Sequence, residues 1–92
     1  MYKRQAKTLQ LKIYYETGEY DALDAHLQSM QTFIRRQRVI GYHKTNYQNI
    51  VRFGRRLLQL NPNSREDRQA MRQQIASEPV LTERDWFLEM LG

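Results

Sequence analysis

A chain of 92 residues is long enough for one domain and too short for two hydrophobic cores. Its composition, 40% hydrophobic and 27% charged with only four Gly and two Pro, excludes disordered and fibrous classes. The lack of cysteine excludes disulfides, thiolate catalysis and cysteine metal sites, and the formal net charge of +5 is distributed in blocks along the chain.

Nothing in the sequence predicts contact with a membrane. No stretch approaches the ~18–20 apolar residues that a membrane-spanning helix needs. Residues 1–7 carry the positive charges of a signal peptide, but no apolar run follows them. Together with the absence of cysteine, these features predict a cytoplasmic protein.

Helical periodicity dominates the first part of the chain. Before Gly18, apolar residues at spacings of three and four define a predicted core face of Tyr2, Ala6, Leu9 and Ile13. After Gly18, a second such face consists of Tyr20, Leu23, Leu27, Met30 and Ile34. Because Gly is favoured just past a helix C-terminus and the connection is short, residues 2–38 are expected to form an antiparallel helical hairpin.

A third, longer helix is expected over residues 42–60, where Asn61 and Pro62 stop it. One half of this helix is apolar and the other half is polar and basic. Gly54 lies at the middle of the apolar half, where it costs about 1 kcal/mol of helix propensity. We therefore expect a neighbouring helix to approach closely at Gly54.

Two shorter helices are expected within residues 64–91. Ser64 with Asp67 resembles a capping box for the first of them, and Thr82 is expected to cap the second. The predicted fold is thus a single all-α domain over residues 1–92, with a hairpin, a third long helix and two short closing helices. The side chains expected to hold it together are Leu9, Ile13, Leu23, Leu27, Ile34, Ile50, Leu57 and Trp86.

The first predicted helix has apolar residues on two sides. Leu11, Tyr14 and Tyr15 lie roughly opposite Leu9 and Ile13. The hairpin partner covers only one side, so the other side needs a further neighbour. We expect Leu11, Tyr14 and Tyr15 to pack against a preceding helical repeat of a longer chain or against a second copy in a homo-oligomer.

The centre of the hairpin resembles a tetratricopeptide (TPR) repeat, which has an aromatic residue four positions before its turn Gly and a Tyr two positions after it. The matching positions are Tyr14, Gly18, Tyr20 and Leu27. Leu23 and Met30 depart from the pattern, because small Ala residues usually pack at their positions. More broadly, the order of features is similar to the C-terminal region of large bacterial proteins built of TPR-like hairpins. This resemblance implies a right-handed solenoid end piece with a scaffold role and no chemistry.

No catalytic, metal or cofactor site is predicted. His26 and His43 lie on different predicted helices, and neither belongs to a metal-ligand spacing. Asp21 and Asp24 lie near a helix start, where they favour the helix dipole. The scattered glycines form no phosphate-binding loop.

A basic band between residues 35 and 56 is the candidate contact surface. Its members are Arg35, Arg36, Arg38, Lys44, Arg52, Arg55 and Arg56. Antiparallel packing is expected to spread them into a stripe and not a tight pocket. Such a stripe can contact phosphates, with Tyr42 or Tyr47 available for base stacking.

Three interpretations of the basic band remain open. It is a solvated face, since cations favour helix C-termini; it contacts an acidic protein surface; or it contacts nucleic acid. We favour them in that order. The predicted function is a non-catalytic, TPR-like interaction or scaffold module without cofactors, whose partners are preceding helical repeats, another protein or a second copy. The alternative is a small basic nucleic-acid-binding domain.

Overall fold

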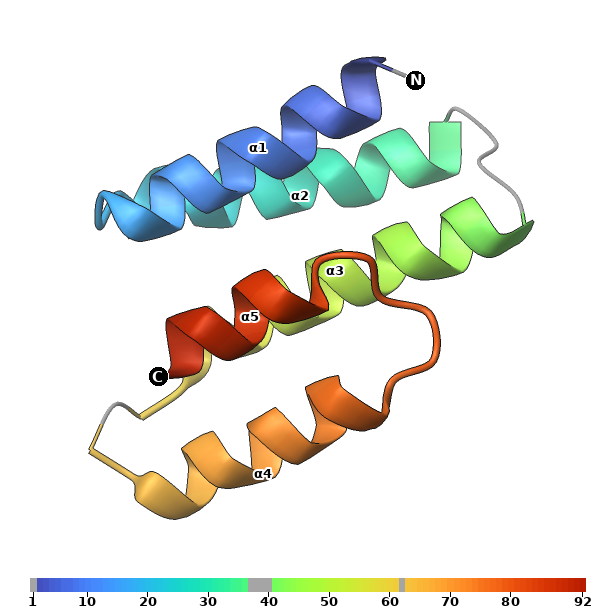
Figure 1. Ribbon diagram of the computed structural model, residues 1–92. Helices are drawn as coiled ribbons and strands as arrows, with labels where there is room; N and C mark the ends of the chain where they lie inside the picture. Colours follow the sequence, from blue (N-terminus) through green and yellow to red (C-terminus); the bar gives the residue numbers. More distant parts are fainter. Residues whose placement is uncertain (1, 37–40, 62) are drawn as a thin grey trace.

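The computed structural model describes residues 2–36, 41–61 and 63–92. Within them the chain forms helices α1 (Tyr2–Glu16), α2 (Tyr20–Arg36), α3 (Gly41–Gln59), α4 (Arg65–Ser77) and α5 (Arg84–Leu91). Each helix runs opposite to the one before it (Figure 1), so the chain folds back on itself four times. The predicted all-α class is confirmed for these residues. Within the same residues, each helix is too short or too polar to cross a membrane.

The turn between α1 and α2 is a Schellman motif, in which the backbone closes the end of α1. The N–H of Glu19 donates to the carbonyl of Tyr14 at 2.9 Å, and the N–H of Gly18 donates to that of Tyr15 at 3.2 Å. Gly18 has a φ of 77°, which a residue without Cβ adopts at little cost. The predicted helix end at Gly18 is therefore confirmed.

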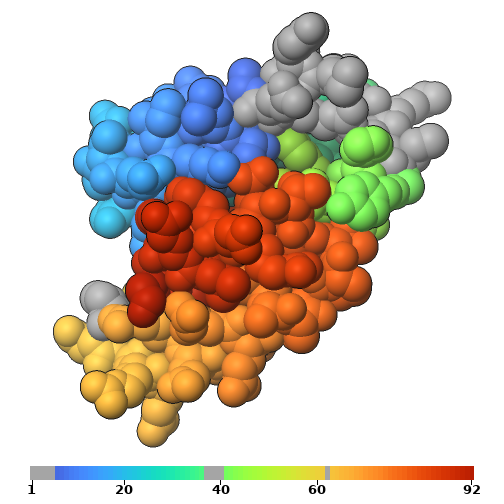
Figure 2. Space-filling model, viewed as in Figure 1, coloured from blue at the N-terminus to red at the C-terminus, as the bar shows by residue number. Residues whose placement is uncertain are grey.

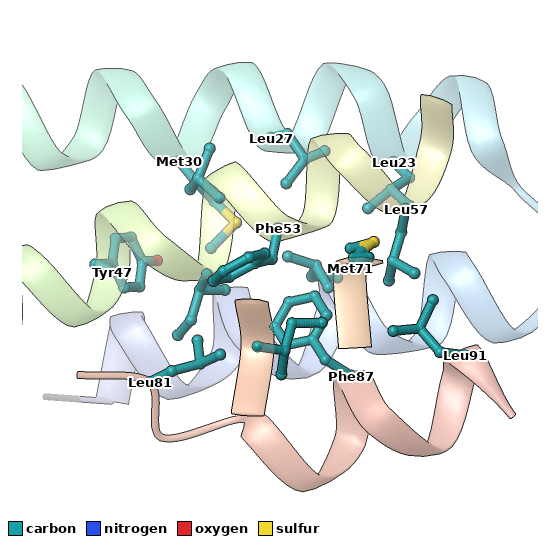
Figure 3. Packing of buried hydrophobic residues seen from close by; sticks show 14 of the residues in the cluster. Leu23, Leu27, Met30, Tyr47, Phe53, Leu57, Met71, Leu81, Phe87 and Leu91 are labelled. Carbon is teal, nitrogen blue, oxygen red and sulfur yellow. The ribbon is translucent and has the colours of Figure 1, made fainter. Parts of the chain in front are cut away.

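The hydrophobic core lies between all five helices (Figure 3). Leu23, Leu27, Met30 and Ile34 bury the inner side of α2, as the periodicity predicted, whereas Tyr20 stays exposed. The other buried side chains are Leu11, Tyr47, Ile50, Val51, Phe53, Leu57, Met71, Ile75, Leu81, Phe87 and Leu91. No polar or charged side chain is buried among the described residues. Burial of these apolar groups is thus the main source of stability.

The predicted close approach at Gly54 is confirmed. A Cβ added to Gly54 would lie 3.0 Å from Leu27 Cδ2 and 3.6 Å from Leu11 Cδ1. Gly54 therefore allows α2 and α1 to reach α3 where a larger residue would push them away.

The prediction for the two sides of α1 is wrong. Leu9 and Ile13 are 58% and 47% exposed, whereas Leu11 is 1% exposed and Tyr14 and Tyr15 pack against the core. The reason is that α5, distant in the sequence, returns beside α1 (Figure 2). The neighbour that the Leu11 side needs is part of this chain.

The contacts between α5 and α1 are specific. The Trp86 ring lies 5.8 Å from the Tyr15 ring, centroid to centroid, and the Trp86 indole N–H donates to Glu16 Oε2 at 3.3 Å. Lys12 forms an ion pair with Glu83, just before α5 begins. Trp86 is half-buried at the edge of the core, so its predicted structural role takes the form of docking α5 onto α1.

The two predicted helix caps have different outcomes. Ser64 caps α4 as expected, because its Oγ accepts a hydrogen bond from the N–H of Asp67 at 3.1 Å. Thr82 does not cap α5, which begins only at Arg84. Instead, the Thr82 hydroxyl accepts a hydrogen bond from Asn46 Nδ2 at 2.9 Å, and its N–H donates to Asn46 Oδ1 at 2.8 Å. The polar atoms of Thr82 thus attach the segment before α5 to α3.

Candidate interaction surface: an arginine-lined groove

An open groove runs between the polar sides of α2 and α3. The apolar sides of both helices pack inward, with Leu27 against Gly54, and leave their polar sides to line the groove. The groove has a volume of about 590 Å³. The residues that line it are Gln31, Ile34 and Arg35 of α2 and Gln48, Val51, Arg52, Arg55, Arg56 and Gln59 of α3.

The charges in the groove are of one sign, since the lining includes four arginines and no carboxylate. Two carboxylates outside the lining form ion pairs with its arginines. Glu78 Oε2 is 3.0 Å from Arg52 Nη2, and Asp24 Oδ1 is 3.7 Å from Arg55 Nη1. Within the described residues no ion pair involves Arg35 or Arg56. The groove therefore keeps an uncompensated positive charge.

Two of the arginines are held in place by neutral neighbours. Arg55 Nη2 donates a hydrogen bond to Gln31 Oε1 at 2.9 Å, which links the two walls of the groove. Arg52 Nη2 donates a hydrogen bond to Asn49 Oδ1 at 3.2 Å. The guanidinium carbon of Arg52 lies 4.6 Å from the centre of the Phe53 ring. Side chains that are already ordered lose less entropy when a partner binds.

The structure brings part of the basic band together in the groove. The groove gathers four of its predicted contact residues, namely Arg35, Arg52, Arg55 and Arg56. Arg36 and Lys44 are exposed but lie outside the lining, and Arg38 lies outside the described residues. Arg35 shares the side of α2 that carries Gln31, and this side faces the basic side of α3, so these four arginines lie along one open groove.

The tyrosines expected to be available for base stacking do not line the groove. Tyr47 is 3% exposed, and its ring packs 5.9 Å from the Phe33 ring. Tyr42 is 55% exposed at the start of α3, away from the lining residues. The groove therefore offers cations and amides, but no aromatic ring on which a base could stack.

The second predicted surface, formed by Leu11, Tyr14 and Tyr15, faces the interior of the molecule. The Tyr14 ring meets the His26 ring edge to face at 5.7 Å, and His26 Nε2 lies 2.8 Å from the carbonyl oxygen of Lys7. These contacts show that His26 is a packed residue. The open side of α1 carries Leu9 and Ile13.

Sequence reasoning missed an apolar hollow where the ends of several helices meet. It has a volume of about 500 Å³ and is lined by Tyr15, Tyr20, Leu57, Leu58, Leu60, Arg68, Met90 and Leu91. Burial raises the pKa of the Tyr15 hydroxyl, and the nearby Tyr20 adds to the rise. No motif could have predicted the hollow, because its residues come from all five helices and the segment after α3.

The described residues place no group of three or more His, Asp or Glu side chains where a metal ion could be held. In comparisons with known proteins, no family model, no curated protein and no solved structure matches the chain.

Proposed function

We propose that this chain is a non-catalytic helical interaction module that binds an acidic protein segment in the arginine-lined groove. The observation that carries the proposal is the set of four guanidinium groups from two helices with no carboxylate in the lining. Guanidinium groups form charge-assisted, often bidentate hydrogen bonds with carboxylates. An acidic partner would supply carboxylates to Arg35 and Arg56, which form no ion pair within the described residues.

One feature of the groove favours a protein partner over nucleic acid. The groove lacks the aromatic platform on which single-stranded bases stack. Arginines bind phosphate as well as carboxylate, so nucleic acid is the competing ligand in the test below.

The proposal includes a scaffold role as the end piece of a TPR-like helical repeat. Its support is the short Schellman turn between antiparallel α1 and α2, together with the exposed side of α1. A neighbouring helical repeat would cover Leu9 and Ile13, which are large apolar residues in contact with solvent.

The test measures binding of fluorescent ligands by anisotropy at low salt. The ligands are a glutamate-rich peptide and single- and double-stranded oligonucleotides of similar length. We expect the peptide to bind, and the double variant Arg35→Glu with Arg56→Glu to weaken its binding by at least about tenfold, or 1.4 kcal/mol. The control is Arg36→Glu with Arg65→Glu, which changes the net charge equally but outside the groove.

The outcomes separate the interpretations. Binding that survives in the control and is lost in the groove variant supports the proposal. Equal weakening in both variants would show a response to net charge alone, and no peptide binding would mean a solvated basic face. Tighter binding of an oligonucleotide, lost in the groove variant, would establish the nucleic-acid alternative. Circular dichroism of each variant checks that it is folded.

A further inference from the structure

We infer that the acidic segment bound in the groove is an α-helix with its carboxylates on one side, and not an extended acidic chain. The inference rests on the proposed function, because it names the conformation and charge pattern of the partner at the same site. It follows from the shape of the groove, the backbone of its walls and the spacing of its arginines.

Both walls of the groove are helices. The backbone N–H and C=O groups of α2 and α3 are hydrogen-bonded within each helix. They are therefore not free to form hydrogen bonds with the backbone of a bound segment. An extended segment bound there would lose water from its peptide groups and find only a few side-chain amides in return. A helix satisfies its own backbone groups and presents only side chains. The groove therefore selects a helical ligand.

The dimensions of the groove agree with this choice. Its lining on α3 extends from Gln48 to Gln59, a rise of about 16 Å for an α-helix. A partner helix of about three turns has that length. The trough between two packed helices is also the place where a third helix fits its ridge of side chains.

The arginine spacing predicts the charge pattern. Arg52 and Arg56 are four residues apart on α3, which corresponds to a rise of about 6 Å. Carboxylates at positions i and i+4 of a partner helix have the same separation. Arg35, on the opposite wall, would meet a further carboxylate at i+7 of the same side. An aliphatic residue at i+3 would lie on the same side of the partner helix, over the small apolar area that Ile34 and Val51 leave exposed, 5% and 2% of these residues.

The experiment compares peptides of identical composition with the full chain. The first peptide places Glu at i, i+4 and i+7 and Leu at i+3 of a helix, and the second distributes the same residues around the helix. All three peptides contain alanines at the remaining positions and one proline, which is terminal in the first two. The third peptide keeps the Glu and Leu pattern of the first, but its proline replaces a central alanine and so breaks the helix. We expect the first peptide to bind at least about tenfold more tightly than the others and to gain helical circular dichroism when bound.

The control that ties the result to the groove is the Arg35→Glu and Arg56→Glu variant, in which the preference among the three peptides should disappear. Equal affinity of the proline-containing peptide would overturn the inference and leave the proposed function standing. Equal affinity of the second peptide would do the same, since it would show that charge alone matters.

Two further outcomes go against the inference in different ways. Binding of none of the peptides at low salt would reject the proposed function together with the inference. Self-association of the chain in light scattering, abolished by the groove variant, would show that the acidic block of a second copy occupies the groove. That block, between Glu16 and Asp24, contains the turn at Gly18 and is not one helix, so this result would also contradict a helical ligand.

Discussion

Leu27 of α2 and Gly54 of α3 meet so closely that a Cβ at position 54 would lie 3.0 Å from Leu27 Cδ2. Both residues are buried, and Leu11 of α1 closes the same space from another side. This contact sets the separation of α2 and α3, and through it the width of the arginine-lined groove on their outer sides.

Replacing Gly54 by alanine should destabilise the protein. Alanine gains about 1 kcal/mol of helix propensity, but overpacking a closed site costs about 1–3 kcal/mol. We expect a net loss of about 1 kcal/mol in the free energy of unfolding, measured by urea denaturation, and a larger loss for Gly54→Val. Gln48→Ala, at an exposed position of α3, is the control and should change little. A Gly54→Ala variant more stable than the natural chain would show that α2 withdraws from α3 without cost.

The two sides of α1 should respond differently to the same substitution. Leu11→Ala removes a buried side chain and should lower the free energy of unfolding by about 2–5 kcal/mol. Leu9→Ala changes a side chain that is 58% exposed, so its effect should stay within about 0.5 kcal/mol. Thermal or urea unfolding of the two variants measures the difference. Similar losses in both would mean that Leu9 has a partner in solution.

Asn46 should contribute more to stability than its partner Thr82. Asn46→Ala removes both hydrogen bonds to Thr82 and leaves the Thr82 N–H without its acceptor, at a cost of about 1–2 kcal/mol. Thr82→Ala keeps the bond from the backbone N–H, so it should cost less. Urea unfolding ranks the two variants, and amide hydrogen exchange at position 82 should speed up only in Asn46→Ala. The reverse ranking would contradict the role of Asn46 in attaching this segment to α3.

Tyr15 should make the protein less stable in alkali. Its pKa in the folded state is raised above 10.0, mainly by burial, so folding disfavours the phenolate. The contribution of Tyr15 to stability is therefore complete below about pH 10 and is lost as the pH rises through the higher folded-state pKa. Between about pH 8 and pH 11, Tyr15→Phe should lose less of its free energy of unfolding than the natural chain does.

The control for the Tyr15 experiment is Tyr42→Phe, at an exposed position. This variant should follow the pH dependence of the natural chain. If Tyr15→Phe and Tyr42→Phe behave alike, burial of the Tyr15 hydroxyl has no measurable effect on stability.

Local features of the sequence determined much of the fold. The 3.6-residue period placed the buried face of α2, from Leu23 to Ile34, because a helix shows one side to the core whatever lies beyond it. Gly18 and Ser64 marked helix ends for equally local reasons, since a Schellman turn and an N-cap need only neighbouring residues. Gly54 indicated a close helix approach, because a glycine on an apolar helix face needs a compensating contact.

Tertiary structure decided everything that depends on residues distant in the sequence. Both sides of α1 are apolar, so periodicity could not choose between Leu9 and Leu11, and the return of α5 buried the Leu11 side. Thr82 looked like a helix cap until the fold brought Asn46 to it. The groove also depends on residues that are distant in the sequence. Its arginines are visible in the sequence, but their convergence depends on how α2 and α3 pack together, with Leu27 against Gly54.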